Sequence, residues 1–260
     1  MLIPVLYEDD EVLALNKPAG LVVHSDGRTK EKTLADWVSE RYPDIKEREV
    51  GEPIILASGS EIKKYGIVHR LDRDTSGVIL VAKTQESFLN LKTQFQSREI
   101  KKNYKAIAHG FFKKTHGSIN KPIARSANDF RKWSAEYGAR GEKREAITEY
   151  QALKQGGART DVRKKKSEMI KLSFVDIFPR TGRTHQIRVH FKAIGHPLLC
   201  DALYAPKMPC ALGFKRTALH SSSIVFQWIN GGEKRVEAPL PDDFSSALAD
   251  TSVCSWIFLQ

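Results

Sequence analysis

The sequence of 260 residues has few of the features that mark membrane, secreted or metal-binding proteins. It contains no run of about 18 apolar residues, which excludes an apolar membrane-spanning helix. Its first residues carry acids where a signal peptide would carry lysine or arginine. Only three cysteines occur, Cys200, Cys210 and Cys254, and they form no CxxC pair. We therefore expect neither a disulfide framework nor a structural zinc site, and a reducing cytoplasm is the simplest compartment.

The sequence has fewer acidic than basic residues: 31 aspartates and glutamates against 42 lysines and arginines, which gives a net charge of +11. Nucleic acid is the commonest partner of such a chain, since each neutralised phosphate releases counterions. An anionic membrane surface fits less well, because no basic amphipathic helix stands out. A merely solubilising surface stays an alternative. The excess is concentrated in residues 113–145, with nine basic and four acidic residues, and in residues 159–166, with five against one.

The hydrophobic pattern predicts an α+β fold with a mixed, mainly antiparallel sheet and flanking helices and loops around a central cleft. Residues 77–82 are continuously apolar, as in a strand buried on both faces. Helical spacing follows Thr33, Thr84 and Gly182, and residues 44–66 and 113–145 are expected to be loops. We expect strands at residues 12–15, 21–24, 104–109, 146–153, 169–178, 219–228 and 235–238. We expect a catalytic domain over residues 1–245 and a C-terminal tail over residues 246–260.

Asp72 is the first candidate for chemistry, within the sequence HRLDRDTSG of residues 69–77. A carboxylate just before a turn and a buried strand is expected at the end of a sheet, where clefts form. The alternative is an aspartate that only caps the turn. Two arginines flank it, and a further basic cluster follows at Arg180, Arg183 and Arg188. A carboxylate kept ionised by an arginine is a plausible nucleophile or base.

Together with four further motifs, HRLDRDTSG resembles the RluA family of RNA pseudouridine synthases. The first is NKPAGLVVH at residues 16–24, and KNYKA at 102–106 is similar to the family's tyrosine motif. AITEY at 146–150 fits a hairpin strand, and RTGRTHQIRVH at 180–190 is similar to the third motif. The resemblance runs from about residue 5 to about residue 240. Many members begin with an S4 RNA-binding domain, and we expect a member without one because the chain starts almost at the first motif.

The resemblance implies an isomerase that converts uridine in RNA to its C-glycoside, pseudouridine. No redox change and no external group are involved, so no cofactor is implied, which agrees with the absence of a dinucleotide or phosphate-loop motif. Asp72 matches the catalytic aspartate, and whether it acts at C1′, C6 or C2′ stays open. Arg183 matches its basic partner and Tyr104 the active-site tyrosine. Arg70 matches a residue that fills the place of the flipped base.

Each of these residues also has a purely structural or non-catalytic interpretation. Arg183 could contact an RNA phosphate, and Tyr104 could belong to the core. Ile187 matches an apolar residue over the active site, although its spacing alone predicts helix core. His69, which we place with Arg70 and Ile187 among the substrate-binding residues, could equally be a structural hydrogen-bonder. No residues have the spacing of metal ligands, so we expect no metal site.

The expected partner is a structured RNA, a stem-loop of ribosomal or transfer RNA, and the expected state is a monomer with no membrane contact. Two other functions stay open. One is an RNA-folding helper that keeps the fold without chemistry. The other is a metal-dependent RNA hydrolase that uses Asp72, Asp74 and His69, for which the sequence offers no further carboxylate cluster.

Overall fold

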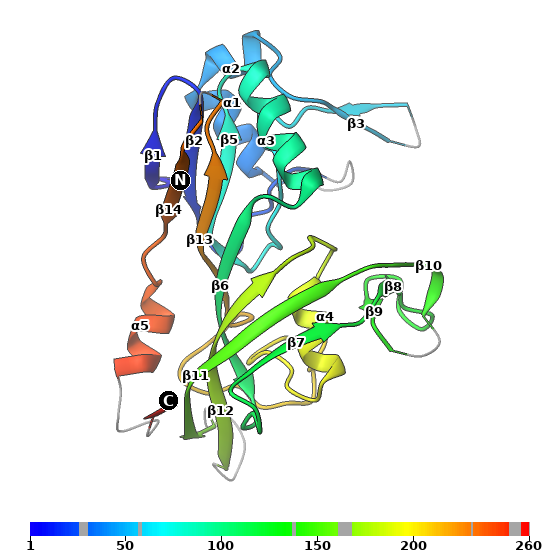
Figure 1. Cartoon of the computed structure of the whole chain (residues 1–260), viewed down its shortest axis with the longest axis vertical. Coiled ribbons are helices and arrows are strands. Elements are labelled where there is room, and N and C mark those ends of the chain that lie inside the picture. The colour runs from blue at the N-terminus through cyan, green and yellow to red at the C-terminus, as the bar shows by residue number, and fades with distance from the viewer. Residues whose placement is uncertain are drawn as a thin grey trace. The chain divides into compact units, whose positions relative to one another are not determined.

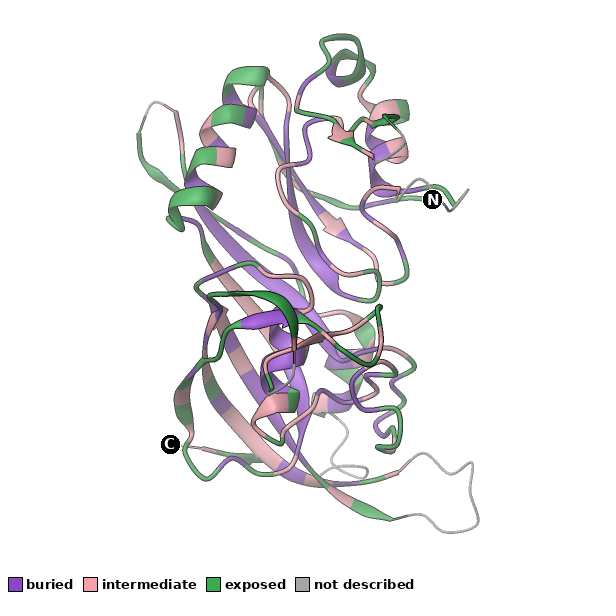
Figure 2. Cartoon of the chain, turned by 90° about the vertical axis from the view of Figure 1, so that its right-hand side faces the viewer, coloured by how far each residue is buried: buried purple, intermediate pink, exposed green. Residues whose placement is uncertain are grey.

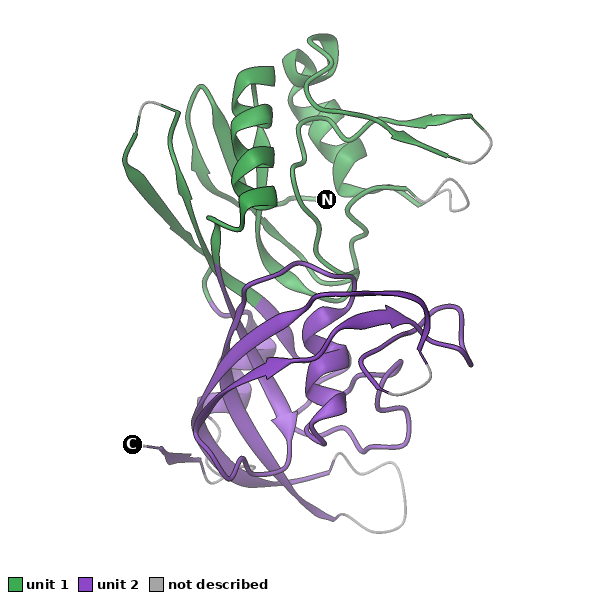
Figure 3. Cartoon of the chain, turned by 45° about the vertical axis from the view of Figure 1, so that its right-hand side comes forward, with its two compact units in different colours: residues 1–101, 221–239 green, residues 102–220, 240–260 purple. Residues whose placement is uncertain are grey.

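The computed structural model describes residues 1–25, 31–56, 59–136, 139–160, 168–229, 231–249 and 256–259. The chain divides into two compact units, coloured separately in Figure 3. Unit 1 comprises Met1–Lys101 and Ser221–Pro239, and unit 2 comprises Lys102–His220 and Leu240–Gln260. Helices and antiparallel strands occur in both units, which confirms the α+β class.

Unit 1 is built on a sheet whose central strand, β5 (Ser76–Ala82), is buried at all seven positions (Figure 2). β2 (Val12–Lys17) runs antiparallel to it, with Val12 opposite Ala82 and Lys17 opposite Gly77. The strand order is β1-β2-β5-β13, and β14 pairs with β13. The further strands are β1 (Val5–Glu8), β13 (Leu219–Gln227), β14 (Glu233–Glu237) and the short hairpin of β3 (Ile54–Ile55) and β4 (Glu61–Ile62), labelled where there is room in Figure 1.

The helices of unit 1 begin where the sequence supplies capping residues. Thr33 caps α1 (Leu34–Arg41) in a capping box with Asp36, and Thr84 caps α3 (Gln85–Ser97). The side chain of Gln94 on α3 donates to the carbonyl of Gln227 at 2.8 Å and accepts from the backbone nitrogen of that residue at 2.8 Å. The amide of Gln94 thereby takes the place of a strand neighbour at the end of β13.

Gly77 lies where strands approach too closely for any side chain. Its φ is +111°, and a Cβ atom there would lie 2.1 Å from the carbonyl oxygen of Ser221. Only glycine fits this position, because a Cβ at that distance would force the backbone of β13 to move. The glycine of TSG is therefore required for β5 to begin directly after the Asp72 turn.

The strands of unit 2 continue the order of the same 10-stranded sheet as β6-β12-β11-β15, with β7 paired to β11. β11 (Ile147–Arg159) and β12 (Met169–Pro179) form the long hairpin that the sequence predicts, with Thr148 opposite Pro179 and Arg159 opposite Met169. The basic tip of this hairpin, with Arg163 and Lys164 to Lys166, lies outside the described residues. The other strands are β6 (Lys101–His109), β7 (His116–Asn120) and β15 (Ile257–Phe258).

Two helices of unit 2 pack on hydrophobic clusters. α4 (Gln186–Ala193) follows the RTGRT turn, and Gly195, with φ +80°, comes just after its end. α5 (Asp242–Ala249) buries Phe244 against Phe214 and Phe174. The expected domain boundary at residue 245 falls inside α5, and the division into catalytic domain and tail stays a prediction.

The two segments expected to be loops contain regular structure. Residues 43–47 form α2 (Pro43–Glu47), because proline fits the first position of a helix as well as it ends one. Within 113–145, β8 (Ile123–Arg125), β9 (Trp133–Ser134) and β10 (Arg140–Arg144) form a separate sheet in the order β10-β8-β9. β10 was not predicted because it has no apolar residue, and a strand is recognised in a sequence by alternating apolar and polar residues.

Cys200 and Cys210 are joined in a disulfide, a pairing that the sequence analysis did not expect. Their Cα atoms lie 5.0 Å apart because the chain turns back between residues 200 and 210. Cys254 lies outside the described residues. The described part of the chain contains no helix with the length and apolar character needed to span a bilayer.

Candidate functional site

Asp72 occupies a tight turn that leads directly into β5. The backbone nitrogen of Thr75 donates to the carbonyl oxygen of Asp72 at 3.1 Å, which closes the turn. Asp72 is half-buried, whereas Thr75 and Ser76 beyond it are buried. The carboxylate therefore sits on a fixed turn at the start of the most buried strand of unit 1, as the sequence predicted.

Lys17 fixes this turn from inside the protein. Its side chain is fully buried, and Nζ donates to the carbonyl oxygens of Pro18 and Leu21, each at 2.8 Å, and of Arg73 at 3.0 Å. The backbone nitrogen of Gly20 also donates to the Arg73 carbonyl at 2.9 Å. The structure thus joins the NKPAG and HRLDRDTSG motifs at one carbonyl group, that of the residue after Asp72.

His69 is held against β5 and the helix that covers it. Its Nε2 accepts from the backbone nitrogen of Leu80 at 2.9 Å, so the neutral ring carries its proton on Nδ1. The ring also stacks on Phe95, with centroids 4.7 Å apart. These contacts give His69 a structural role, and its expected contact with substrate stays a prediction.

Arg70 and its basic neighbours give the Asp72 turn a positive surrounding. Arg70 is exposed, and its charge contributes, after burial as the main cause, to lowering the pKa of His24 below its ordinary value. Lys64 acts on His24 in the same direction. The guanidinium of Arg73 contacts Glu31 at 2.7 Å, with both side chains about half exposed. Arg70 and Lys64 therefore place positive charge near His24, whereas Glu31 balances the charge of Arg73.

In unit 2, Tyr104 and Ile187 belong to the same hydrophobic cluster. Tyr104 lies half-buried on β6 opposite Ile177 of β12, and Ile187 on α4 is only 6% exposed. Lys102 lies two residues before Tyr104, and therefore on the same face of β6. Burial lowers the pKa of Lys102 to about 8. The side chain is still mostly charged at neutral pH, but its ammonium group gives up a proton more easily than that of an exposed lysine.

The turn that carries Arg183 is held by the side-chain amide of Gln186. Its Oε1 accepts from the hydroxyl of Thr181 at 2.7 Å and from the backbone nitrogen of Arg183 at 2.9 Å. Its Nε2 donates to the carbonyl of Ile147 and the hydroxyl of Thr148, each at 3.0 Å. Arg183 itself donates from Nε to the carbonyl of Glu145 at 3.0 Å. The third motif is thereby fastened to the AITEY strand.

A second network fixes the start of α4. Arg188 makes a bidentate pair with the buried Asp201, with both bonds at 2.8 Å, and its guanidinium lies 5.0 Å from the ring centre of Tyr204. The hydroxyl of Tyr204 lies 2.9 Å from Nδ1 of His185, which adopts the left-handed region with φ +55°. His190 bonds separately to Thr148 and to the Lys121 carbonyl, each at 2.9 Å. His185 and His190 thus have different hydrogen-bond partners.

The predicted site residues divide between the two units. Unit 1 holds Asp72, Arg70 and His69, and unit 2 holds Tyr104, Arg183 and Ile187. The expected pairing of Arg183 with Asp72 joins residues of different units and stays a prediction. Within the described ranges, no three or more His, Cys, Asp or Glu side chains are grouped to hold a metal ion.

The family model for RNA pseudouridylate synthases matches residues 11–193. The chain belongs to the RNA pseudouridylate synthase family. The matched region includes Lys17, the Asp72 turn, Tyr104 and the Arg183 turn, so the predicted site residues of both units lie within it.

Several relatives and solved structures in the family are similar to the chain. An uncharacterised RNA pseudouridine synthase of Aquifex aeolicus is 37% identical over 205 residues, covering 79% of this chain and 57% of the relative. Ribosomal large subunit pseudouridine synthase D of Neisseria meningitidis serogroup A is 34% identical over 260 residues, covering 96% of this chain and 61% of the relative. The chain therefore spans about three fifths of the length of these relatives. A human structure, RNA pseudouridylate synthase domain containing 1, shares the fold with a TM-score of 0.71 at 22% identity, covering 100% of this chain and 90% of that one.

Several residues of this chain were not given a role from its sequence. Lys17 belongs to the NKPAG motif, but no role was predicted for it. The sequence indicated its burial only by placing it just after the apolar residues of β2. Gln186 was given no function, and Arg188 was named only as part of a basic cluster. Asp201 and Tyr204 lie more than seven residues beyond the end of α4, and nothing local links them to that helix. Their roles arise from contacts between distant segments, which spacing does not show.

Proposed function

We propose that the chain isomerises specific uridines of ribosomal or transfer RNA to pseudouridine. The observation that carries this proposal is the Lys17 anchor, which fixes the turn of Asp72 to the first family motif. A carboxylate on a rigid, half-buried turn amid Arg70, Lys64 and Arg73 suits a polyanionic substrate. Rigid placement matters because an attacking group must be held close to its target geometry.

The reaction is balanced within the nucleotide. The N1–C1′ bond breaks, the uracil rotates, C5 bonds to C1′, and the proton leaves C5 for solvent while N1 gains one. We propose that the Asp72 carboxylate assists departure of the base, with C1′, C6 and C2′ as the possible points of action. No electrons are exchanged with an external partner, so the proposal includes no cofactor and no metal.

We assign the remaining roles from the motifs and the local geometry. Arg183, on a turn clamped by Gln186, would orient the Asp72 carboxylate through its planar guanidinium. Tyr104 would stack on the uracil and bring its hydroxyl within reach of proton transfer. Ile187 would provide the apolar side chain beside it, and Arg70 would occupy the place of the extruded base. His69 would hold its segment against β5 through the hydrogen bond from Leu80. Only its other ring nitrogen, Nδ1–H, would be left to contact the substrate.

The partner is proposed to be a stem-loop of ribosomal or transfer RNA, bound by a monomer in the cytoplasm. The net charge of +11 supports an RNA partner. The name of the Neisseria relative, a ribosomal large subunit synthase, supports ribosomal RNA as the first substrate to test.

The test is tritium release from transcribed ribosomal and transfer RNA that carries uridine labelled at C5. Asp72→Asn should fold normally and lose at least about three orders of magnitude in single-turnover rate, as when a covalent-catalysis residue is removed. Asp74→Asn, the same change two residues further on, should keep most of the activity. EDTA should have no effect. Release that survives Asp72→Asn, or that EDTA abolishes, would contradict the assignment. Strand annealing without release would indicate a folding helper.

A further inference from the structure

Phe130 presents a largely exposed aromatic ring, and its backbone is held in a fixed turn. Its side chain is 80% exposed. Arg125 donates from Nη1 to the carbonyl of Phe130 at 2.9 Å, and the nitrogen of Ser126 donates to the carbonyl of Lys132 at 3.0 Å. A single exposed ring is common on protein surfaces, so the charges and the aromatic ring around Phe130 must show whether it belongs to a binding surface.

Asp129 strengthens this turn from the other side. Its carboxylate accepts from the backbone nitrogen of Arg131 at 3.0 Å and from the guanidinium of that residue at 3.1 and 2.9 Å. The Arg131 guanidinium is the main cause that holds the pKa of Asp129 well below its ordinary value, so the carboxylate stays ionised. The turn is therefore closed without any contact from the Phe130 ring, which leaves the ring available.

The sheet behind this turn carries unbalanced positive charge. Arg125 on β8 and Arg140 on β10 are directly opposite each other in the antiparallel pair, and both are exposed. Directly opposite residues share one face of a sheet, where like charges repel. Among the described residues, neither arginine has a carboxylate partner. An anion between the two guanidinium groups would remove the repulsion.

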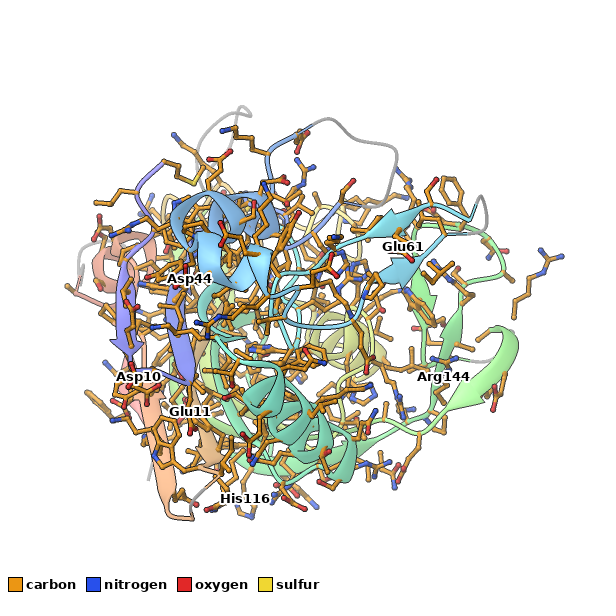
Figure 4. All side chains as sticks on the ribbon, turned by 90° about the horizontal axis from the view of Figure 1, so that it is seen from above. Asp10, Glu11, Asp44, Glu61, His116 and Arg144 are labelled. Atoms are coloured by element: carbon orange, nitrogen blue, oxygen red, sulfur yellow. A yellow bond between two sulfur atoms is a disulfide. The ribbon has the colours of Figure 1, made fainter. Side chains whose placement is uncertain are left out.

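The rest of β10 adds to this field. All five of its residues are exposed, three of them basic and one acidic. Arg144 at its end is labelled beside the β10 ribbon in Figure 4, in which the side chains are drawn as sticks. On β9, the ring of Trp133 lies under Arg125, with the guanidinium carbon 4.4 Å from the ring centre. Aromatic rings beside a basic strand are the usual composition of a surface that binds unpaired nucleic acid.

We infer that the sheet β8–β9–β10 and the 126–132 turn form a subsite for one unpaired nucleotide of the RNA. The base stacks on Phe130, and a neighbouring phosphate sits between Arg125 and Arg140. The inference takes RNA as partner from the proposed function, but it is independent of the isomerisation step.

The subsite is tested by binding of two fluorescein-labelled RNAs, a dodecauridylate single strand and a blunt duplex of twelve base pairs. Phe130→Ala should weaken binding of the single strand by about 5- to 100-fold, the range for loss of one base stack. Binding of the duplex should change less than about twofold, because its bases are already stacked. Phe130→Trp should keep the affinity. Arg140→Gln should reduce the log–log salt dependence of single-strand binding by about 0.7, the value for one phosphate contact.

The matched control is Phe258→Ala, which removes an equally exposed ring, 73% exposed, elsewhere in unit 2. It should leave both affinities unchanged. Equal losses from the two variants, equal losses for the two RNAs, or no loss at all would overturn the subsite. A concentration-dependent dimer of the wild type that Phe130→Ala abolishes would also overturn it, since a second copy would then cover the ring.

Tritium release separates this inference from the proposed function. At saturating RNA, Phe130→Ala should keep the wild-type single-turnover rate, because the ring takes no part in the chemistry. If the wild type released no tritium from any RNA, the proposed function would fail while the contrast between single strand and duplex could still be measured. If release were normal and the contrast absent, only the subsite would fail.

Discussion

The hydroxyl of Tyr204 lies 2.9 Å from Nδ1 of His185 and accepts from the backbone nitrogen of Trp133 at 3.0 Å. One phenol oxygen thus joins the turn before α4 to the strand β9. His185 is two residues from Arg183, and Trp133 belongs to the sheet inferred to bind an unpaired nucleotide. The contact is the physical connection between the proposed RNA subsite and the third family motif.

Tyr204→Phe should destabilise the protein by about 1 kcal/mol, because the partly buried backbone nitrogen of Trp133 loses its acceptor. The ring under Arg188 is kept, so the loss reports the hydroxyl alone. Urea unfolding measures it, and single-turnover tritium release below the unfolding transition should also fall. Tyr150→Phe, which removes a hydroxyl for which no hydrogen bond is described, should cost less than about 0.5 kcal/mol. Equal effects of the two variants would contradict the prediction.

Lys17→Met should be among the most destabilising single changes in unit 1. The three carbonyl groups of Pro18, Leu21 and Arg73 would lose a buried donor, at a total cost of about 3 kcal/mol or more. The free energy of unfolding in urea measures this cost. Lys83→Met removes a less buried ammonium, which contacts Glu8 at 3.0 Å, and should cost about 1 kcal/mol or less. A loss for Lys17→Met no larger than that of this control would show that the anchor is dispensable.

Arg183→Lys should lower the single-turnover rate by at least about tenfold while RNA affinity changes little. Lysine keeps the charge but lacks the planar fork that would orient a carboxylate. The variant is compared with Arg180→Lys, which alters the exposed pair with Glu149 at 2.8 Å and should affect neither quantity strongly. A fall in affinity with an unchanged saturated rate would instead assign Arg183 to an RNA phosphate.

The stability of the protein should fall as the pH drops from about 6.5 toward 4, in part because of His109. Burial lowers the pKa of His109 to about 4, below the value of 6.5 expected in the unfolded chain. The unfolded state therefore binds the proton first, and the loss from this group reaches about 2 kcal/mol at pH 5. Unfolding free energies of wild type and His109→Leu at pH 7 and pH 5 measure it. The difference between the two pH values should be smaller in His109→Leu, whereas His116→Leu, at an exposed ring, should behave as wild type.

Local patterns predicted the elements whose signals are local. The apolar run of 77–82 forms β5, Thr84 caps α3 as expected, and β11 and β12 form the expected hairpin. The helix expected from Thr33 is α1, with Thr33 itself as its cap. α2 was missed because a proline after a helix usually ends it, whereas Pro43 also begins the next helix. β8, β9 and β10 were missed because an exposed strand such as RGEKR needs no apolar alternation.

The motifs identified the residues proposed for chemistry but not the residues that hold them. Nothing near Lys17 in the sequence shows that its ammonium meets the carbonyl of a residue 56 positions away. Tyr204 and His185 are 19 positions apart and meet only after the chain turns back. Contacts of this kind depend on the completed fold, and so does the disulfide of Cys200 and Cys210.

Because Lys17 is buried, the rate at which it is acetylated can report how fast the Asp72 turn opens. An amine-acetylating reagent reaches exposed lysines at once, but it reaches this ammonium only when the carbonyl groups around it release it. The rate at which mass spectrometry detects acetyl-Lys17 then equals the rate of local opening, provided that acetylation is faster than closing. An RNA that engages Asp72 would slow the acetylation of Lys17. Binding of the RNA could therefore be followed without any label on it.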